Sequence, residues 1–224
     1  MQKIIWGFTM LLIANCVSSQ EAGISPMNTD AVVFSTENMQ LSLNSTGFIT
    51  SLRCGNPAVE YLPEGRQPAL LFLLVDDKRL APVASDFDAA TGVFSLQYEN
   101  NITVKVQVIK KSTHLTFELI SLEGAKPQRI EWGSFPTIIG KIVGETIAVV
   151  RDDNIAIGLQ SLNIQTIGGA AKTDFGSQLS AFAIEHDGGV LHSKIALFAC
   201  PASEALDTIG EIELAEGLPH PMLD

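Results

Sequence analysis

The sequence predicts an all-β fold, an antiparallel β-sandwich followed by a C-terminal helix. Short apolar or alternating segments recur along residues 31–199, and turn-forming residues separate them at short intervals. No helical repeat of apolar residues occurs between these segments, and the first convincing one begins at residue 204. Because each strand has an apolar face that needs cover, we expect a second sheet to lie over the first.

The N-terminus has the features of a secretory signal peptide at residues 1–19. Lys3 supplies a positive charge, residues 4–13 form a short apolar run, and small residues precede the cleavage point. The sequence therefore predicts a secreted or periplasmic protein. Cys16 loosely matches a lipid-attachment site, but the preceding asparagine fits poorly, so cleavage without lipidation is favoured. No later run is long and apolar enough to span a bilayer.

The first part of the exported chain predicts a group of short strands. Residues 31–36 and 39–43 are strand candidates, and the Asn-Ser-Thr-Gly turn at 44–47 connects the second of them to a strand at 48–52. This arrangement predicts a hairpin. Residues 53–68 contain five glycines and prolines, which predicts a loop.

The next segments predict longer strands with clear faces. Residues 69–75 are nearly all apolar, as in a strand buried on both faces, and a turn begins at Asp76. Residues 93–99 and 102–110 alternate apolar and polar side chains, so one face of each belongs to the core. Residues 114–122 form a further strand candidate.

The central stretch predicts a strand end, a shaped loop and a hairpin. A strand ends at Glu131 and Trp132, and a Gly- and Pro-rich excursion fills residues 133–144. Two apolar runs at 146–150 and 155–159 then predict a hairpin around a charged turn.

The last part of the sandwich predicts an edge segment, a loop and two paired strands. Residues 162–167 are extended, and the glycines and alanines of 168–177 predict a loop. Residues 179–186 and 190–199 are strand candidates, which the Asp-Gly-Gly sequence between them would join as a hairpin.

A helix follows at residues 204–215. Ser203 is a candidate N-cap, the stripe Leu206, Ile209, Ile212 and Leu214 has helical spacing, and Gly217 ends the element. We therefore divide the exported chain into a β-sandwich domain at 20–200 and a helical linker at 201–224 that leads towards a catalytic domain outside this sequence.

Composition limits the classes of partner. The hydrophobic fraction of 46% is ample for a core, and the net charge of −11 makes nucleic acid a poor partner because an acidic surface repels phosphates. Cys54 and Cys200 are the cysteines beyond the signal peptide, and we favour two buried thiols over a disulfide. No cofactor-binding or metal-binding pattern is found, so the sequence predicts neither a cofactor nor a metal.

The residues that could contact carbohydrate lie in the central stretch. Glu131 and Trp132 combine an aromatic ring, which stacks on sugars, with a carboxylate, which holds hydroxyl groups. Arg151, Asp152 and Asp153 are a charged group that could hold a polar ligand. The structural alternatives, a core tryptophan beside a solvated glutamate and a simple charged turn, stay open and are favoured at both places.

An enzymatic alternative uses histidines. A sugar-ring-opening epimerase needs an acid and a base across the sugar, commonly His and Glu. His186 and His192 flank the predicted hairpin turn and could face each other, with Glu185 or Glu131 as the carboxylate. Surface histidines beside a turn are the favoured alternative.

Several motifs resemble the N-terminal, galactose-mutarotase-like sandwich domain of large secreted bacterial glycoside-hydrolase-like proteins. They are LSLNSTGFITSL at 41–52, EWGSFPTII at 131–139, GETIAVVRDD at 144–153, IAIGLQSLN at 155–163 and IELAEGLPHPMLD at 212–224. The resemblance implies a supersandwich that packs on a catalytic barrel and helps to shape its substrate cleft. The catalytic carboxylates of such proteins lie in the barrel, beyond this chain.

Three functions follow as hypotheses. The favoured one is a non-catalytic sandwich module of a secreted protein that degrades polysaccharide, packing on a catalytic domain and contacting glycan. The alternatives are an aldose-epimerase-like enzyme acting on free sugars and a purely structural interaction module.

Overall fold

The computed structural model describes residues 32–144 and 147–219, and the elements of the fold follow from these. The predicted signal peptide at 1–19, with Cys16, lies outside the described residues. All strand pairings between the named elements are antiparallel, and the sandwich is completed by one α-helix near the C-terminus. The predicted all-β class is confirmed.

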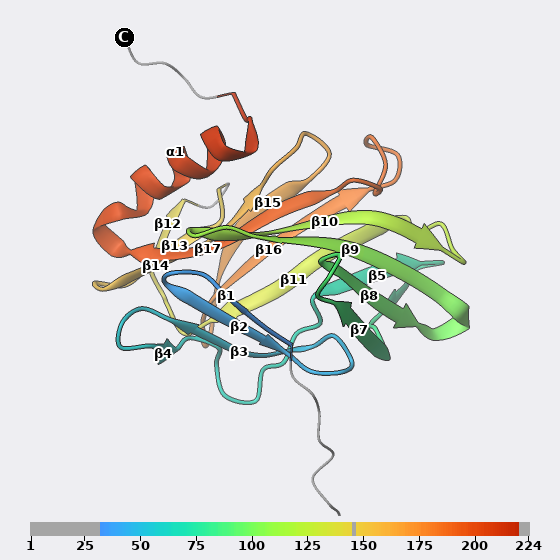
Figure 1. Cartoon of the computed structure of the whole chain (residues 1–224), viewed down its shortest axis with the longest axis horizontal. Helices are drawn as coiled ribbons and strands as arrows, with labels where there is room; N and C mark the ends of the chain where they lie inside the picture. Colours follow the sequence, from blue (N-terminus) through green and yellow to red (C-terminus); the bar gives the residue numbers. More distant parts are fainter. Residues whose placement is uncertain (1–31, 145–146, 220–224) are drawn as a thin grey trace, which may run out of the picture.

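Three sheets build the fold (Figure 1). The four-stranded sheet contains, in spatial order, β1 (Val32–Ser35), β2 (Met39–Leu43), β3 (Ile49–Cys54) and β4 (Val59–Glu60). The eight-stranded sheet contains β12 (Ile142–Gly144), β13 (Val149–Arg151), β14 (Ile155–Ser161), β17 (Lys194–Pro201), β10 (His114–Glu123), β9 (Ile102–Lys110), β8 (Val93–Tyr98) and β7 (Ala84–Asp88). The five-stranded sheet contains β15 (Ile167–Thr173), β16 (Gly176–Ile184), β11 (Arg129–Thr137), β5 (Leu71–Val75) and β6 (Lys78–Leu80).

One continuous hydrophobic core joins the three sheets. It contains Leu41 of β2, Leu73 of β5, Val104 of β9 and Trp132 of β11, all fully buried. The alternation predicted for residues 102–110 is confirmed, since the apolar side chains of β9 up to residue 108 are buried while its other side chains are half-buried or exposed. Period-two alternation is therefore the feature that places the strands.

The strand that carries Glu131 and Trp132 does not end there. β11 continues to Thr137 because a β-bulge between Gly133 and Phe135 absorbs one extra residue. Gly133 has φ +67°, and a Cβ there would lie 2.1 Å from the ring of Phe135, so the bulge requires glycine. The prediction of a loop is therefore wrong for residues 133–137, which belong to β11.

Two other predicted loops contain strands. The two-residue strand β4 interrupts the loop predicted at 53–68, and it pairs with the end of β3. The glycines and alanines of 168–177 lie mostly in β15, which pairs along its whole length with β16. Strand propensity is low for these small residues, but pairing with a neighbouring strand outweighs it.

The strand prediction is also wrong at two further places. Residues 69–75 are not buried on both faces, because Phe72, Leu74 and Val75 are only half-buried. The extended segment predicted at 162–167 is a turn up to residue 166, and β15 begins at its last residue.

The predicted hairpin around residues 187–189 does not form. β16 belongs to the five-stranded sheet and β17 to the eight-stranded sheet, so the segment at 185–193 crosses from one sheet to the other. Backbone hydrogen bonds hold this crossover against Leu119 of β10, which accepts from the N–H of His192 (2.8 Å) and donates to the carbonyl of Ser193 (3.0 Å).

Helix α1 (Ala205–Glu216) lies against the outer side of the eight-stranded sheet (Figure 1). Its buried residues Ile209 and Ile212 form a second, smaller core with residues of β13, β14 and β17. The helix ends at Gly217 as predicted. Ser203 is not its N-cap, because a 3₁₀ turn at Ala202–Glu204 leads directly into the helix without a side-chain cap.

The outer face of α1 carries apolar side chains that nothing described covers. Leu206 is 73% exposed and Leu214 is 66% exposed, so only half of the predicted apolar stripe packs on the sheet. Within residues 32–144 and 147–219, no helix has the length and apolarity that a bilayer span requires. Cys54 and Cys200 are both buried and free, which confirms the prediction of unpaired thiols.

A buried ion cluster fixes the C-terminal end of α1. The carboxylate of Glu216, with 4% of its side chain exposed, accepts from Lys111 Nζ, from Lys194 Nζ at 2.7 Å, and contacts His114 Nε2 at 3.1 Å. Lys111 also donates to the carbonyl of Ala215, one of the free carbonyls at the helix end (3.2 Å). Burial lowers the pKa of His114, so the neutral imidazole is favoured.

Candidate functional site

Trp132 lies in the core and offers no face to a sugar. Its side chain has no exposed surface, and its indole Nε1–H donates to the hydroxyl of Ser193 at 2.8 Å. That hydroxyl also shares a hydrogen bond with Thr166 at 2.9 Å. This position agrees with the favoured alternative of a core tryptophan, because residue 132 points inward from β11 while its neighbour points outward.

Glu131 lies on the outward face of β11. Its carboxylate accepts a hydrogen bond from Arg79 Nε at 2.8 Å and forms an ion pair with Arg129, whose Nη2 lies 3.3 Å from Oε1. The side chains of these three residues are 25%, 47% and 37% exposed, in the order Glu131, Arg79 and Arg129. The carboxylate predicted from the sequence is therefore accessible, and it organises two guanidinium groups.

Each guanidinium also stacks on a phenylalanine. The Cζ atom of Arg79 lies 3.4 Å from the ring centroid of Phe72, and that of Arg129 lies 4.1 Å from that of Phe182. Phe72 and Phe182 flank Glu131 directly in the register of β5, β11 and β16. We call these five residues the guanidinium–aromatic face. Stacking and ion pairing together hold both guanidinium planes in fixed orientations.

The charged turn after β13 is organised around Asp152. Its Oδ1 accepts from the N–H groups of Asn154 (2.7 Å) and Ile155 (2.8 Å), and its Oδ2 accepts from the Tyr61 hydroxyl (3.1 Å). Burial opposes ionisation of Asp152, but these hydrogen bonds outweigh it and lower its pKa. Burial and the bond to Asp152 raise the pKa of Tyr61 to about 12.

The other two charged residues of this turn have separate surroundings. Arg151 donates from Nη1 to the carbonyl of Ala202 (3.3 Å), and Asp153 is exposed. Both oxygens of Asp152 already accept hydrogen bonds from groups within the molecule. Among residues 32–144 and 147–219, no group of three His, Cys, Asp or Glu side chains has a metal-binding arrangement.

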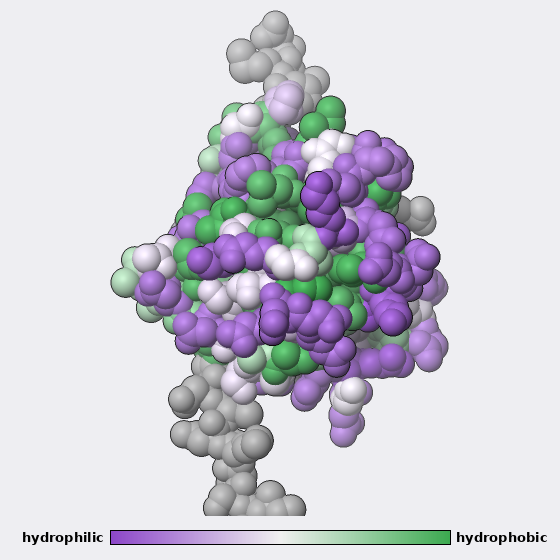
Figure 2. Space-filling view, turned by 90° about the vertical axis from the view of Figure 1, so that its right-hand side faces the viewer, coloured by the Kyte–Doolittle hydropathy of each residue, from purple (hydrophilic) through white to green (hydrophobic). Residues whose placement is uncertain are grey.

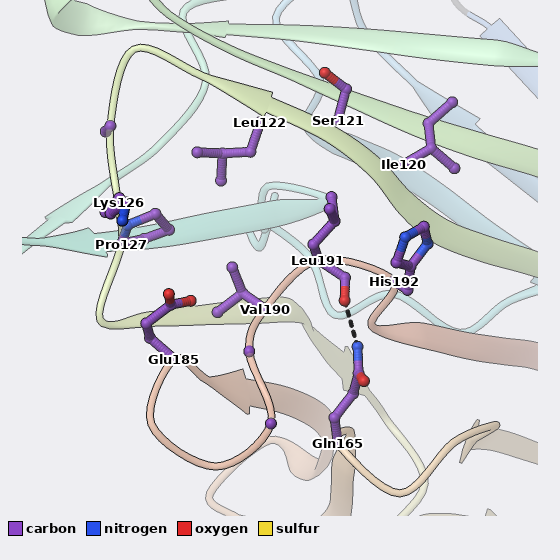
Figure 3. A pocket seen from close by; sticks show the side chains of 13 residues that line it. Ile120, Ser121, Leu122, Lys126, Pro127, Gln165, Glu185, Val190, Leu191 and His192 are labelled. Atoms are coloured by element: carbon purple, nitrogen blue, oxygen red, sulfur yellow. Dashed lines mark hydrogen bonds between the residues drawn. The ribbon is translucent and has the colours of Figure 1, made fainter.

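Two residues of the epimerase alternative, Glu185 and His192, line one cavity of about 670 Å³ (Figure 3). The cavity lies between the end of β10 with its following loop and the crossover at 185–193. Figure 3 shows Glu185 and His192 towards opposite ends, with Val190 and Leu191 between them. His186 does not line the cavity; its side chain is 80% exposed and contacts Asp187 at 3.2 Å.

The backbone that presents His192 is held in an unusual conformation. His192 has φ +69°, which side chains other than glycine seldom adopt. Its carbonyl accepts from Asn163 Nδ2 at 2.6 Å, and its Nδ1 lies 3.1 Å from Glu118 Oε1. The right-hand end of the molecule in Figure 1 faces the viewer in Figure 2, where apolar patches lie between polar side chains.

Sequence reasoning found Glu131 but missed its partners. Arg129 lies two residues away on the same strand, so the alternation of strand faces could have identified it. Phe72, Arg79 and Phe182 come from three other strands, and only the register of the sheet places them beside Glu131.

No family model matches the chain, and no curated protein matches it. One solved structure similar to it is a GH31 family sulfoquinovosidase from E. rectale in complex with an aza-sugar inhibitor, at 12% sequence identity and a TM-score of 0.38. The similarity covers 82% of this chain and 34% of the sulfoquinovosidase, so the chain spans about a third of the length of that protein.

Proposed function

We propose that this chain is a non-catalytic β-sandwich module of an exported carbohydrate-active protein, and that it contacts glycan through the guanidinium–aromatic face. The observation that carries the proposal is the pair of guanidinium groups, each fixed on a phenylalanine ring and both bridged by Glu131 on an open sheet surface.

The chemistry of this face suits a sugar chain. A guanidinium plane stacked on a ring offers a flat surface to the C–H face of a sugar, and its outer N–H groups can donate to hydroxyls. The Nε of Arg79 is used by Glu131, which leaves its two Nη groups for a ligand. Phe72 and Phe182 lie two strand spacings apart, about 10 Å, so that two linked sugar rings can lie across the face.

The proposal extends to a partner domain. The exposed Leu206 and Leu214 on the outer face of α1 support packing of a further domain against the helix, since such side chains gain from being covered. The sequence resemblance supports a catalytic barrel as that domain and export of the whole protein.

Removal of Arg79 tests glycan contact at this face. We expect Arg79→Ala to weaken retention on the insoluble polysaccharide that best retains the unmodified chain by about tenfold, the usual effect of losing a hydrogen bond to a charged group. The measurement is a depletion isotherm over a panel of insoluble polysaccharides. The exposed pair that the substitution breaks contributes at most about 1 kcal/mol to stability, so the fold survives.

Lys105→Ala is the matched control, because it removes one exposed positive charge from the eight-stranded sheet. Equal weakening by both substitutions would mean that net charge alone governs retention and would overturn the proposed face. Retention of neither protein on any polysaccharide would favour a purely structural module.

An aldose-epimerase-like activity is the second candidate, because Glu185 and His192 line the same cavity. We expect the chain to leave the mutarotation rate of galactose and glucose, followed by polarimetry, at its value in buffer. An acceleration that His192→Asn abolishes and His186→Asn preserves would contradict this expectation and establish the enzyme.

A further inference from the structure

A second cavity, of about 530 Å³, lies beside the turn that follows β13. Three asparagines from three separate connections line it: Asn38 between β1 and β2, Asn56 between β3 and β4, and Asn154 between β13 and β14. The cavity therefore lies where the four-stranded sheet meets the eight-stranded sheet. We call it the asparagine pocket.

The main chain at this pocket is fixed. The carbonyl of Asn38 accepts from Gly55 N–H (2.9 Å), and that of Asn154 accepts from Ala202 N–H (3.0 Å). Asn154 N–H in turn donates to Asp152. In the described part of the chain, none of the three side-chain carboxamides has a hydrogen-bond partner, so each has its donors and its acceptor available to a ligand.

The lining of the asparagine pocket carries no ionised side chain. Besides the asparagines it consists of Cys54, Gly55, Pro57, Val59, Tyr61, Ile155 and Pro201. Burial raises the pKa of the Cys54 thiol, and the Tyr61 phenol keeps its proton because it donates to Asp152.

We propose that the asparagine pocket binds one neutral sugar unit. The three carboxamides hydrogen-bond its hydroxyl groups, and Pro57, Val59 and Ile155 contact the C–H face of its ring. The cavity volume lies in the range of small-ligand pockets, which combine apolar walls with a few polar groups. The inference deepens the proposed function and rests on it for the choice of carbohydrate over other neutral polar ligands.

The uncharged lining also sets specificity. A sugar acid would bring a carboxylate into a pocket that offers no cation, and the loss of its hydration would go uncompensated. Carboxamides can donate and accept at once, which matches the hydroxyl groups of a neutral sugar.

Side-chain amide signals of the ¹⁵N-labelled chain give a direct test. Titration with glucose, galactose and xylose, and with glucuronate as the charged comparison, is followed by two-dimensional NMR. We expect at least one neutral sugar to shift the side-chain NH₂ signals of Asn38, Asn56 and Asn154 together, and glucuronate to leave them unchanged. We expect Asn154→Ala to lower the affinity for that sugar about fivefold, the effect of losing one neutral hydrogen bond.

Gln97→Ala is the matched control, since it removes an exposed carboxamide from β8, outside the pocket, and it should leave the affinity unchanged. The proposed sugar site is contradicted if no neutral sugar shifts the three asparagine signals. It is equally contradicted if glucuronate shifts them as much as a neutral sugar does. Polysaccharide retention that depends on Arg79 while the asparagine signals stay silent would leave the proposed function standing. If the asparagine signals shift but retention does not depend on Arg79, glycan contact at the guanidinium–aromatic face is contradicted, while sugar binding in the asparagine pocket is supported.

Discussion

Replacement of Trp132 by alanine is expected to lower the free energy of unfolding by about 3–5 kcal/mol, the range for removing a large buried aromatic side chain. The ring is fully buried in the core that joins all three sheets. Its loss leaves a cavity, and it also removes the indole donor from the hydroxyl of Ser193. The measurement is chemical denaturation followed by circular dichroism.

Trp132→Phe separates the two contributions. It keeps an aromatic ring in the core, and the Ser193 hydroxyl retains its bond to Thr166, so we expect a smaller loss of about 1–3 kcal/mol. The folded Trp132→Phe protein should bind polysaccharide as the unmodified chain does, because the indole does not reach the surface. A stability change below about 1 kcal/mol for Trp132→Ala would contradict the burial of this residue.

The parts of the fold that the sequence predicts correctly depend on local patterns. Residues 102–110 alternate so regularly that one strand face could be assigned in advance. The hairpin of β13 and β14 follows from two apolar runs on either side of a polar turn. The helix follows from the spacing of Ile209 and Ile212 and from Gly217 at its end.

The errors occur where non-local pairing decides the conformation. Gly133 suggests a loop, but its pairing with Ser180 of β16 and the hydrogen bond from its N–H to the carbonyl of Leu70 hold it in a bulge within β11. The Asp-Gly-Gly sequence at 187–189 suits a hairpin turn, but the strands that it joins belong to different sheets. Neither outcome is encoded in the few residues concerned.

The candidate sites follow the same division. The sequence identifies Glu131 as a candidate because an aromatic residue follows it. The aromatic residues beside it on the outward face are Phe72 and Phe182, however, and not Trp132. The three asparagines of the second pocket lie far apart in sequence. The pairing of β2 with β3 brings Asn38 and Asn56 together, and the contact between two sheets adds Asn154.

The ion cluster at the end of α1 is expected to make stability depend on pH. Burial disfavours the charged form of Glu216, but the bonds from Lys111, Lys194 and His114 outweigh it and lower its pKa from 4.5 to about 2. A carboxylate with a lowered pKa in the folded state stabilises it fully above pH 4.5 and loses that contribution as the pH falls towards 2. This lowering of the Glu216 pKa corresponds to a contribution of about 3 kcal/mol to the free energy of unfolding.

Glu216→Gln is expected to cost about 3–5 kcal/mol at neutral pH, because it leaves two lysines beside an uncharged amide in a buried position. The difference in unfolding free energy from the unmodified chain should shrink between pH 4.5 and 2, where the native carboxylate itself takes up a proton. Glu211→Gln, at an exposed position of the same helix, is the control and should change stability little.

The direction of this pH dependence distinguishes the cluster from a simple loss of packing. A packing defect at residue 216 would cost the same free energy at every pH, so the curves of the two proteins would run parallel. His114 also lowers the free energy of unfolding as the pH falls. Because its pKa is lowered in the folded state, the unfolded chain takes up this proton first below pH 6.5. Convergence of the curves at low pH would show that the charge of Glu216 holds the helix, and with it Ile209 and Ile212, against the sandwich.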